Sequence, residues 1–359
     1  MAALAFRPLT PRDIPALRAI GEYVAPLTWE SDSQDAHPGV AQQVLEMLGQ
    51  HARESRRFGA FVDGDLCCAL TMRPQVIAYR WDVVALCAGS GRHPVSAEVA
   101  TDVWASLLEY GIAASGSLGA KRVFAVAGEG TPAAASLRSA GFETYAHQML
   151  YTATGVPEDA EPLPGFREQE PSDVWSIHQL YHHVTPRPVQ FAEALTSAAW
   201  ELPQPTARER FFPSRRQATQ TVLETIDGIV AYSRITTGKH AARVDLLVEP
   251  AIRNVTARFL SHSLALAGVR NDEIGVVIPE YAVDLCSQLE RLGFTFVTER
   301  VALVRHTTAP AVVYERFAGP VVEGERVPKG VPSYFNIQTD SCAGAPAMSV
   351  SSTGKRMER

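Results

Sequence analysis

Apolar and polar positions alternate along the first 150 residues with the two periods that predict strands and helices. Two apolar runs flank Asp63-Gly64, a hairpin signal, and further strand-like runs cover residues 79–88, 121–128 and 143–154. Helical spacing follows Thr10-Pro11-Arg12-Asp13, where we expect a helix to about Val24, and recurs over 38–54, at Val99, Val103 and Leu107, and over 131–141. The predicted order is βααββ followed by βαβαβ.

Residues 243–268 form the most informative stretch of the chain. An apolar run that includes Val244, Leu246 and Val248 ends at Pro250, a polar loop is expected over 251–256, and helical spacing follows it. A helix that begins directly after a buried strand directs its free N–H groups and the positive end of its dipole into the intervening loop. The pattern therefore predicts a strand, a loop and a helix that together can bind an anion.

The element order of the first half recurs in the second half. Four landmarks return 152 to 164 residues later: Arg7 as Arg167, Asp63 as Asp227, Arg92 as Arg253, and Gly141 as Gly293. Between the halves, residues 154–165 are rich in proline, glycine and acid and lack periodicity. We interpret the chain as an internal duplication with domains at 1–153 and 166–316, a linker at 154–165, and a largely disordered C-terminal tail at 317–359.

Composition limits the class of protein. A length of 359 residues favours two domains, and a net charge of -6 argues against a nucleic-acid partner. The five cysteines lack metal-ligand spacing and are expected to be reduced thiols. The N-terminus lacks a basic stretch followed by an apolar core, and no apolar run approaches the length of a membrane span. We therefore expect a cytoplasmic protein without membrane contact.

The repeated unit resembles the GNAT N-acetyltransferase fold over residues 5–153 and 165–308. The resemblance rests on the opening RPLTPRDIPAL and FREQEPSDV, the two Asp-Gly hairpins, the strand-loop-helix, and the closing LRSAGF and LERLGF. It implies an α/β (α+β) protein made of two tandem GNAT-like units. Each unit would be a mixed, mostly antiparallel sheet of six or seven strands flanked by helices.

The resemblance also implies a site for acetyl-CoA. In this family the fourth strand carries a bulge and splays from the fifth, the pantetheine arm lies in the gap, and the pyrophosphate sits at the following helix start. The cofactor-binding residues carried over to this chain are Arg92 and Ala97 in the first unit, and Leu247, Val248, Arg253, Asn254, Val255, Thr256, Ala257 and Arg258 in the second.

Several positions depart from the family pattern. Thr256 and Arg258 occupy positions where the family has glycine, and Pro94 and Val95 interrupt the first loop. Arg258 is interpreted either as a phosphate ligand or as a surface residue that closes the site. The tyrosine that often precedes the final Gly-Phe and protonates the leaving thiolate is replaced by Leu137 and Leu289.

Acyl transfer to an amine requires a group that accepts a proton, often a carboxylate. Asp245 and Glu249, on the central strand of the second unit, are the predicted catalytic residues, and Asp82 is a further candidate in the first unit. The alternative for each is a solvated carboxylate at the rim of a sheet.

His178 and His182 are four residues apart on a predicted helix and are compatible with metal binding, although no third ligand is evident. Substrate contact or simple surface histidines are the competing interpretations, and we assign no metal.

The resemblance implies an acyl-CoA-dependent N-acetyltransferase that acts on an amine of a small molecule or peptide. The alternative is a non-catalytic binding or assembly protein that kept the GNAT fold and lost acetyl-CoA binding.

Overall fold

The computed structural model describes residues 4–20, 23–26, 55–75, 79–89, 97–155, 161–202, 217–238, 241–269 and 272–307. These residues belong to one compact unit, and residues 313–359 lie outside the described part. The predicted helix at 38–54 and the predicted C-terminal tail at 317–359 also lie outside the described residues.

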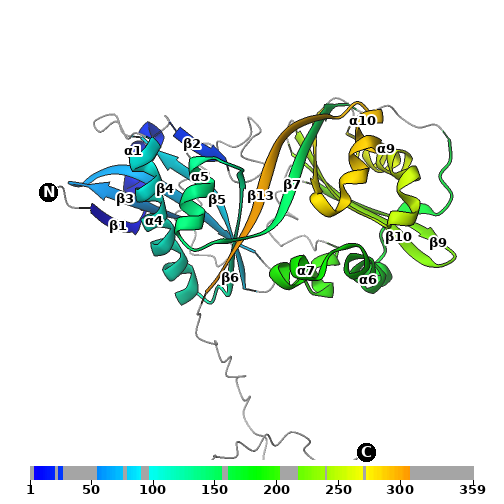
Figure 1. Cartoon of the computed structure of the whole chain (residues 1–359), viewed down its shortest axis with the longest axis horizontal. Coiled ribbons are helices and arrows are strands. Elements are labelled where there is room, and N and C mark those ends of the chain that lie inside the picture. The colour runs from blue at the N-terminus through cyan, green and yellow to red at the C-terminus, as the bar shows by residue number, and fades with distance from the viewer. Residues whose placement is uncertain are drawn as a thin grey trace, which may run out of the picture. The chain divides into compact units, whose positions relative to one another are not determined.

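Both halves of the chain contain the same succession of strands and helices, except that the third element is strand β2 in the first half and helix α7 in the second (Figure 1). The first repeat comprises β1 (Leu4–Pro8), α1 (Ile14–Ala19), β2 (Tyr23–Pro26), β3 (Arg56–Val62), β4 (Asp65–Pro74), β5 (Arg80–Ala88), α4 (Ala97–Ser117), β6 (Arg122–Gly128), α5 (Pro132–Ser139) and β7 (Glu143–Thr154). The second repeat comprises β8 (Phe166–Glu168), α6 (Val174–Val184), α7 (Arg187–Glu193), β9 (Gln217–Thr225), β10 (Gly228–Thr237), β11 (Ala241–Val248), α9 (Thr256–Leu266), β12 (Glu273–Pro279), α10 (Cys286–Arg291) and β13 (Thr295–His306).

The opening of each repeat is built by the same hydrogen bonds. Arg7 binds both carboxylate oxygens of Asp13 at 2.8 and 2.7 Å, and Arg167 binds both oxygens of Asp173 at 2.6 and 2.8 Å. Each aspartate also accepts the backbone N–H three residues before it, at 2.8 Å from Thr10 and 2.7 Å from Glu170. A bidentate guanidinium and a capped helical turn thus explain why the arginine, proline and aspartate recur together in the sequence.

The two repeats exchange their final strands. Within the described residues the sheet order is β1-β3-β4-β5-β6-β13-β7-β12-β11-β10-β9-β8, and β2 pairs with β5. The last strand of the second repeat, β13, pairs with β6 of the first repeat, and β7 of the first repeat pairs with β12 of the second. Figure 1 shows β7 and β13 side by side where they connect the two repeats. The result is a 13-stranded, mostly antiparallel sheet in which β5–β6 and β11–β12 are the parallel pairs among the described strands.

Each hydrophobic core therefore contains side chains from the other repeat. Val301 and Leu303 of β13 belong to the core beneath α4, and Tyr151 and Ala153 of β7 belong to the core beneath α9. The fold class predicted from the sequence, two repeated mixed sheets flanked by helices, is confirmed. The domain boundaries at 153 and 166 stay a prediction, and the exchange means that residues on both sides of 154–165 complete each core.

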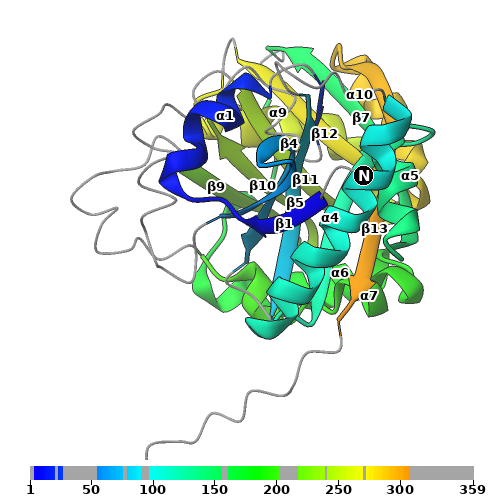
Figure 2. The same cartoon turned by 90° about the vertical axis from the view of Figure 1, so that its left-hand side faces the viewer.

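Helices cover both faces of the first repeat's sheet. Figure 2 shows α1 and α4 on opposite sides of β1, β4 and β5. Phe58 and Leu70 pack in the cluster beneath α4, whereas Phe61 and Ala69 pack in the cluster beside α1. Strands that are buried on both faces are almost continuously apolar, which explains the run Leu66–Leu70.

Two local predictions differ from the structure. The first helix ends at Ala19 instead of near Val24, and residues 23–26 form β2 against the part of β5 that β6 does not cover, so strand pairing overrides the helical pattern there. The expected polar loop at 251–256 is largely a 3₁₀ helix, Pro250–Val255, which contains a kink at Ile252 and leads directly into α9.

Close packing of α4 on the sheet gives a prediction about two glycines of the same helix. A Cβ at position 111 would lie 2.6 Å from Leu70 Cδ2 and 2.8 Å from Met72 Sδ, and both neighbours are fully buried. We expect Gly111→Ala to lower the free energy of unfolding by about 1 to 3 kcal/mol, because overpacked cores must shift side chains or backbone.

The matched control is Gly116→Ala, where the nearest atom to the new methyl group is Thr307 Cβ at 3.8 Å. This change should be neutral or stabilising by up to about 1 kcal/mol, since alanine is the better helix former. Chemical denaturation of both variants checks the prediction, and equal stability of the two would contradict it.

Candidate active site

Each repeat contains one pair of parallel strands that separate after a short paired segment. Strand β5 pairs with β6 only from Arg80 to Asp82, although β5 continues to Ala88. Strand β11 pairs with β12 only from Ala241 to Val244 and continues to Val248. The two strands of each pair therefore separate toward their carboxyl ends. In the first repeat, β2 pairs with residues 85–88 of β5 and so occupies the edge that β6 leaves, whereas no described strand pairs with β11 on that side beyond Val244.

A β-bulge distinguishes the two gaps. The pairing of β4 with β5 shifts between Thr71 and Met72, which places Val84 as an extra residue in β5 beside the first gap. The pairing of β10 with β11 keeps one register over its whole length. A bulge bends its strand and increases the local twist, and bulges often occur next to active sites. The first gap therefore has a distortion that the second lacks.

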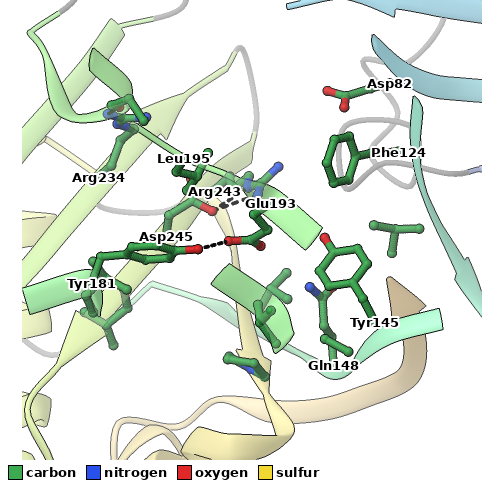
Figure 3. Close-up of a pocket in the computed structure, with 18 of the residues that line it drawn as sticks. Asp82, Phe124, Tyr145, Gln148, Tyr181, Glu193, Leu195, Arg234, Arg243 and Asp245 are labelled. Carbon is green, nitrogen blue, oxygen red and sulfur yellow. Dashed lines mark hydrogen bonds and ion pairs between the residues drawn. The ribbon is translucent and has the colours of Figure 1, made fainter. Parts of the chain in front are cut away.

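Both gaps open on one cavity of about 520 Å³. Asp82, Val83 and Val126 line it from the first repeat, and Asp245 and Val277 line it from the second. Figure 3 shows Asp82, Phe124 and Tyr145 on one side of this space and Tyr181, Arg234 and Asp245 on the other. The strand exchange is what brings the two sets of residues to the same cavity.

The cavity lies beside an approximate twofold axis that relates the repeats. Gln148 and Arg300 each lie seven residues after the glycine that follows the preceding helix, and they are paired with each other across β7 and β13. Both side chains line the cavity, and Arg300 is only 8% exposed. Burial lowers the pKa of the Arg300 guanidinium.

Helix α7 of the second repeat carries a carboxyl group into the cavity. Val189 and Ala192 pack this helix on Ala146 of β7 and Phe124 of β6, so it covers strands of the first repeat. Glu193 is its last residue, and its Oε2 accepts a hydrogen bond of 2.7 Å from the Tyr181 hydroxyl (Figure 3). Burial raises the pKa of Glu193, Asp245 raises it further, and Tyr181 and Arg80 oppose the shift. Such a carboxyl, perturbed by burial in a cavity, is a candidate acid or base.

Tyr145 enters the cavity from an irregular position in β7. The register between β7 and β13 shifts beside it, and its ring packs edge-on against Phe124 at 6.0 Å between centroids. Burial raises the pKa of its hydroxyl, so the group remains protonated at neutral pH. The cavity thus contains one carboxyl group with a raised pKa, Glu193, and one tyrosine hydroxyl that keeps its proton at neutral pH, Tyr145.

Two further carboxylates in the cavity are held by arginines of their own strand. Asp82 Oδ1 accepts from Arg80 Nε at 3.0 Å, and its Oδ2 accepts from Gln75 Nε2 at 2.6 Å. Asp245 Oδ1 accepts from Arg243 Nη2 at 2.7 Å. These pairs fix the orientation of both aspartates at the start of the two gaps.

Comparison with solved structures identifies this arrangement. The chain is similar to a GCN5-related N-acetyltransferase from Sphaerobacter thermophilus, with a TM-score of 0.50, 13% sequence identity, and coverage of 84% of this chain and 95% of that one. It is also similar to a tandem GNAT protein from the clavulanic acid biosynthesis pathway, with a TM-score of 0.49, 16% identity, and coverage of 85% and 98%. No family model matches the sequence, and no curated protein matches it.

The chain has a tandem GNAT fold. At these identities the similarity shows the fold alone. None of the described helices is long and apolar enough to cross a membrane.

Within the GNAT fold, the predicted carboxylates occupy different surroundings. Asp245 lines the cavity, as does Asp82. Glu249 lies at the end of β11 outside the cavity lining, where His183 Nε2 is 3.7 Å from its Oε1. The structure therefore brings Asp245 and Asp82 to the shared cavity and leaves Glu249 at its outside.

The predicted cofactor residues of the second repeat are mostly engaged with their own chain. Leu247 lines the cavity and Val248 is buried in the core beneath α9. Arg253 forms an ion pair with Asp284, and Arg258 Nη2 lies 3.2 Å from Glu161 Oε2. The remaining members of this predicted set are Asn254, which is exposed, Val255 and Ala257, which are half-buried, and Thr256, which is buried.

The start of α9 is thus contacted by the segment that joins the repeats. Arg258 also donates weakly to the carbonyls of Glu161 and Pro162, both at 3.4 Å. Thr256, in a position where the family has glycine, is 1% exposed, and its hydroxyl lacks a partner in the described residues. In the first repeat, Arg92 lies outside the described residues, and Ala97 is the first residue of α4.

The positions where a catalytic tyrosine was expected contain fully buried leucines, Leu137 and Leu289. Sequence reasoning missed Tyr145, Tyr181 and Glu193, which supply hydroxyl and carboxyl groups to the cavity instead. No local signal in the sequence placed the last turn of the helix that contains Glu193 over strands of the first repeat.

The histidines of α6 form a hydrogen-bonded series beside the cavity. Trp200 Nε1 donates to His178 Nδ1 at 3.1 Å, so the second ring nitrogen of His178 carries the proton and lies 3.2 Å from His182 Nε2. His182 Nδ1 in turn lies 2.5 Å from Gln190 Oε1, which can only accept. Each contact is satisfied when both rings are neutral. Among the described residues, no group of three His, Cys, Asp or Glu side chains is arranged to bind a metal.

This series predicts a dependence of stability on pH. Burial lowers the pKa of His178 below 6.5, and His182 lowers it further. The unfolded chain therefore binds more protons than the native chain, so stability is present above pH 6.5 and is lost as the pH falls towards the native pKa. We expect His178→Asn to reduce this loss between pH 7.5 and 5.5.

Denaturation at several pH values measures the effect, with the exposed His306 as the control position in His306→Asn. Protonation of carboxylates that are ion-paired in the native state, such as Asp173, lowers stability at more acidic pH. The raised pKa of Glu193 has the opposite effect, because it makes the native state more stable as the pH falls. A wild-type slope that is unchanged in His178→Asn would contradict the assignment.

Proposed function

We propose that the chain transfers an acyl group from acetyl-CoA to an amine of a small molecule or peptide. The donor would occupy the gap between β5 and β6, and the acceptor would occupy the adjoining cavity. The observation that carries this proposal is that residues of the first gap and Glu193 of the second repeat line the same cavity.

We assign the acyl donor to the first gap because of its bulge at Val84, which the second gap lacks. Since β2 pairs with residues 85–88 of β5, the donor would lie between Asp82 and that pairing. At the helix that follows the second gap, Arg258 is bound by Glu161 and Thr256 is buried. When bound, acetyl-CoA supplies a thioester, an activated acyl group for the amine. The assignment of the donor to residues 247–258 from the sequence stays a prediction, and the substitutions of Val126 and Val277 described below test it.

Glu193 is proposed to accept the proton that the amine must lose. A general base is most effective when its pKa lies near the working pH, and burial moves the pKa of Glu193 in that direction. Tyr145 keeps its proton at neutral pH and can supply it to the leaving group. Asp82 and Asp245 are held by arginines, so we assign them to orienting the acceptor amine rather than to proton transfer.

The competing function, binding without catalysis, applies best to the second repeat. The start of its helix α9 is contacted by its own chain, and residues of α6, α7, β10, β11, β12 and β13 line the cavity. We propose that the second repeat completes the acceptor site of the first. A chain in which neither gap bound coenzyme A would have the binding function alone.

A pair of matched substitutions distinguishes the two gaps. Val126 and Val277 are the fifth residues of β6 and β12, and both are half-buried and line the cavity. We expect coenzyme A to raise the melting temperature of the wild type, since a ligand that binds only the native state stabilises it. Val126→Trp should abolish this rise because it fills the first gap, and Val277→Trp should retain it.

Each variant is compared with its own melting temperature without ligand. Loss of the rise in Val277→Trp alone would assign the donor to the second repeat and to residues 247–258. No rise in the wild type would remove the enzymatic proposal.

Replacement of the proposed base, Glu193, should lower the rate of acyl transfer without unfolding the protein. We expect Glu193→Gln to reduce kcat for acyl transfer by roughly 10²- to 10⁴-fold, the usual contribution of a general base. The rate of the wild type should fall as the pH is lowered through the pKa of Glu193, which lies above 4.5. The variant should lose that part of the pH profile.

The control is Glu201→Gln, an exposed carboxylate outside the cavity lining, which should keep the wild-type rate. A Glu193→Gln enzyme with full activity and an unchanged profile would show that another group accepts the proton.

A further inference from the structure

The charges that line the cavity are unequal in number. Four arginines and three carboxylates line the space, and two of the arginines are bound to aspartates two residues away on the same strand. The other two arginines are Arg234 and Arg300, and the third carboxyl is Glu193, which is hydrogen-bonded to Tyr181. Among the lining residues, arginines therefore outnumber carboxyl groups by one.

Arg234 makes its hydrogen bonds to uncharged acceptors. Its Nη2 donates to the carbonyl of Ala199 at 2.8 Å and to the amide oxygen of Gln220 at 3.4 Å. Its Nε is buried and lacks a hydrogen-bond partner within the described residues. A buried N–H group that has lost water without gaining an acceptor is unfavourable, so this atom favours a ligand that accepts.

Arg300 adds a second, almost fully buried guanidinium to the same cavity. It projects from β13, next to Gln148 on β7, and it is 8% exposed. A guanidinium in a site of low dielectric interacts strongly with an anion. The planar N–H groups of an arginine match the two oxygens of a carboxylate in particular.

We infer that the amine accepted in this cavity also carries a carboxylate, which Arg234 binds and Arg300 attracts. The inference rests on the proposed function, because it concerns the acceptor of that reaction. The substrate class is that of amino acids and short peptides with a free carboxyl end. The amino group would face Glu193, and the carboxylate would face the arginines.

The test compares amines that differ only in this charge. A panel of α-, β- and γ-amino acids and dipeptides is measured beside the corresponding C-terminal amides, using the full chain. Binding is followed by thermal shift and calorimetry without an acyl donor, and transfer is followed separately with acetyl-CoA. We expect at least one acid to bind at least tenfold more tightly than its amide, and to show a KM lower by a similar factor.

Arg234→Gln should remove this preference, and Arg300→Gln should reduce it. Arg234→Lys keeps the positive charge and stays closer to the native packing. It lacks the two parallel N–H groups that match a carboxylate, so it should keep only part of the preference. Arg187→Gln is the control, because Arg187 is exposed at the start of α7 and outside the cavity lining.

The outcomes separate the two proposals. Equal binding and equal KM for acids and amides, no binding by any acid, or an unchanged preference in Arg234→Gln would each overturn the carboxylate site. Transfer to amines without a preference would leave the acyltransferase proposal standing. Tight binding of acids without transfer to any amine would support the carboxylate site and remove the acyltransferase proposal.

Discussion

The pairing of β13 with β6 and of β7 with β12 is the interaction on which the rest of the structure depends. Each repeat ends in a 12-residue strand, long enough to leave its own half and enter the sheet of the other. Backbone hydrogen bonds in the interior of a sheet must be made, so each repeat requires the strand of its partner. Val301 in the first core and Tyr151 in the second show that side-chain packing requires the same exchange.

The exchange also creates the site. Because β7 and β13 lie side by side, the gap of the first repeat and helix α7 of the second repeat reach one cavity. Glu193 then lies beside Arg80 of the other repeat, whose charge acts on its pKa. The candidate base and the candidate donor gap therefore come from different repeats, so the cavity belongs to the duplicated chain and to neither repeat alone.

Two copies of one unit have diverged at the positions where the GNAT fold holds its cofactor. The first repeat has a bulge at Val84 beside its gap, and the second has a regular strand. The start of α9 is contacted through Arg258 by the segment that joins the repeats. Once two sites share a cavity, a single donor gap is sufficient, and the other repeat is free to adapt its side chains to the acceptor. The arginines of the second repeat, Arg234 and Arg300, fit that division.

The sequence by itself determined the repeated order of strands and helices, because the period of apolar residues and local signals such as Asp63-Gly64 act over short distances. It also indicated that both repeats open with the same arginine, proline and aspartate, and it indicated the strands on which Asp82 and Asp245 lie. The ion pairs Arg7–Asp13 and Arg167–Asp173 are seen in the structure. Only the tertiary structure decided that β7 and β13 are exchanged, since an intact and an exchanged strand have the same pattern of burial. For the same reason, Glu193 and Tyr145 could not be assigned from sequence: their surroundings are formed by residues far away in the chain, and burial among those residues sets their pKa values.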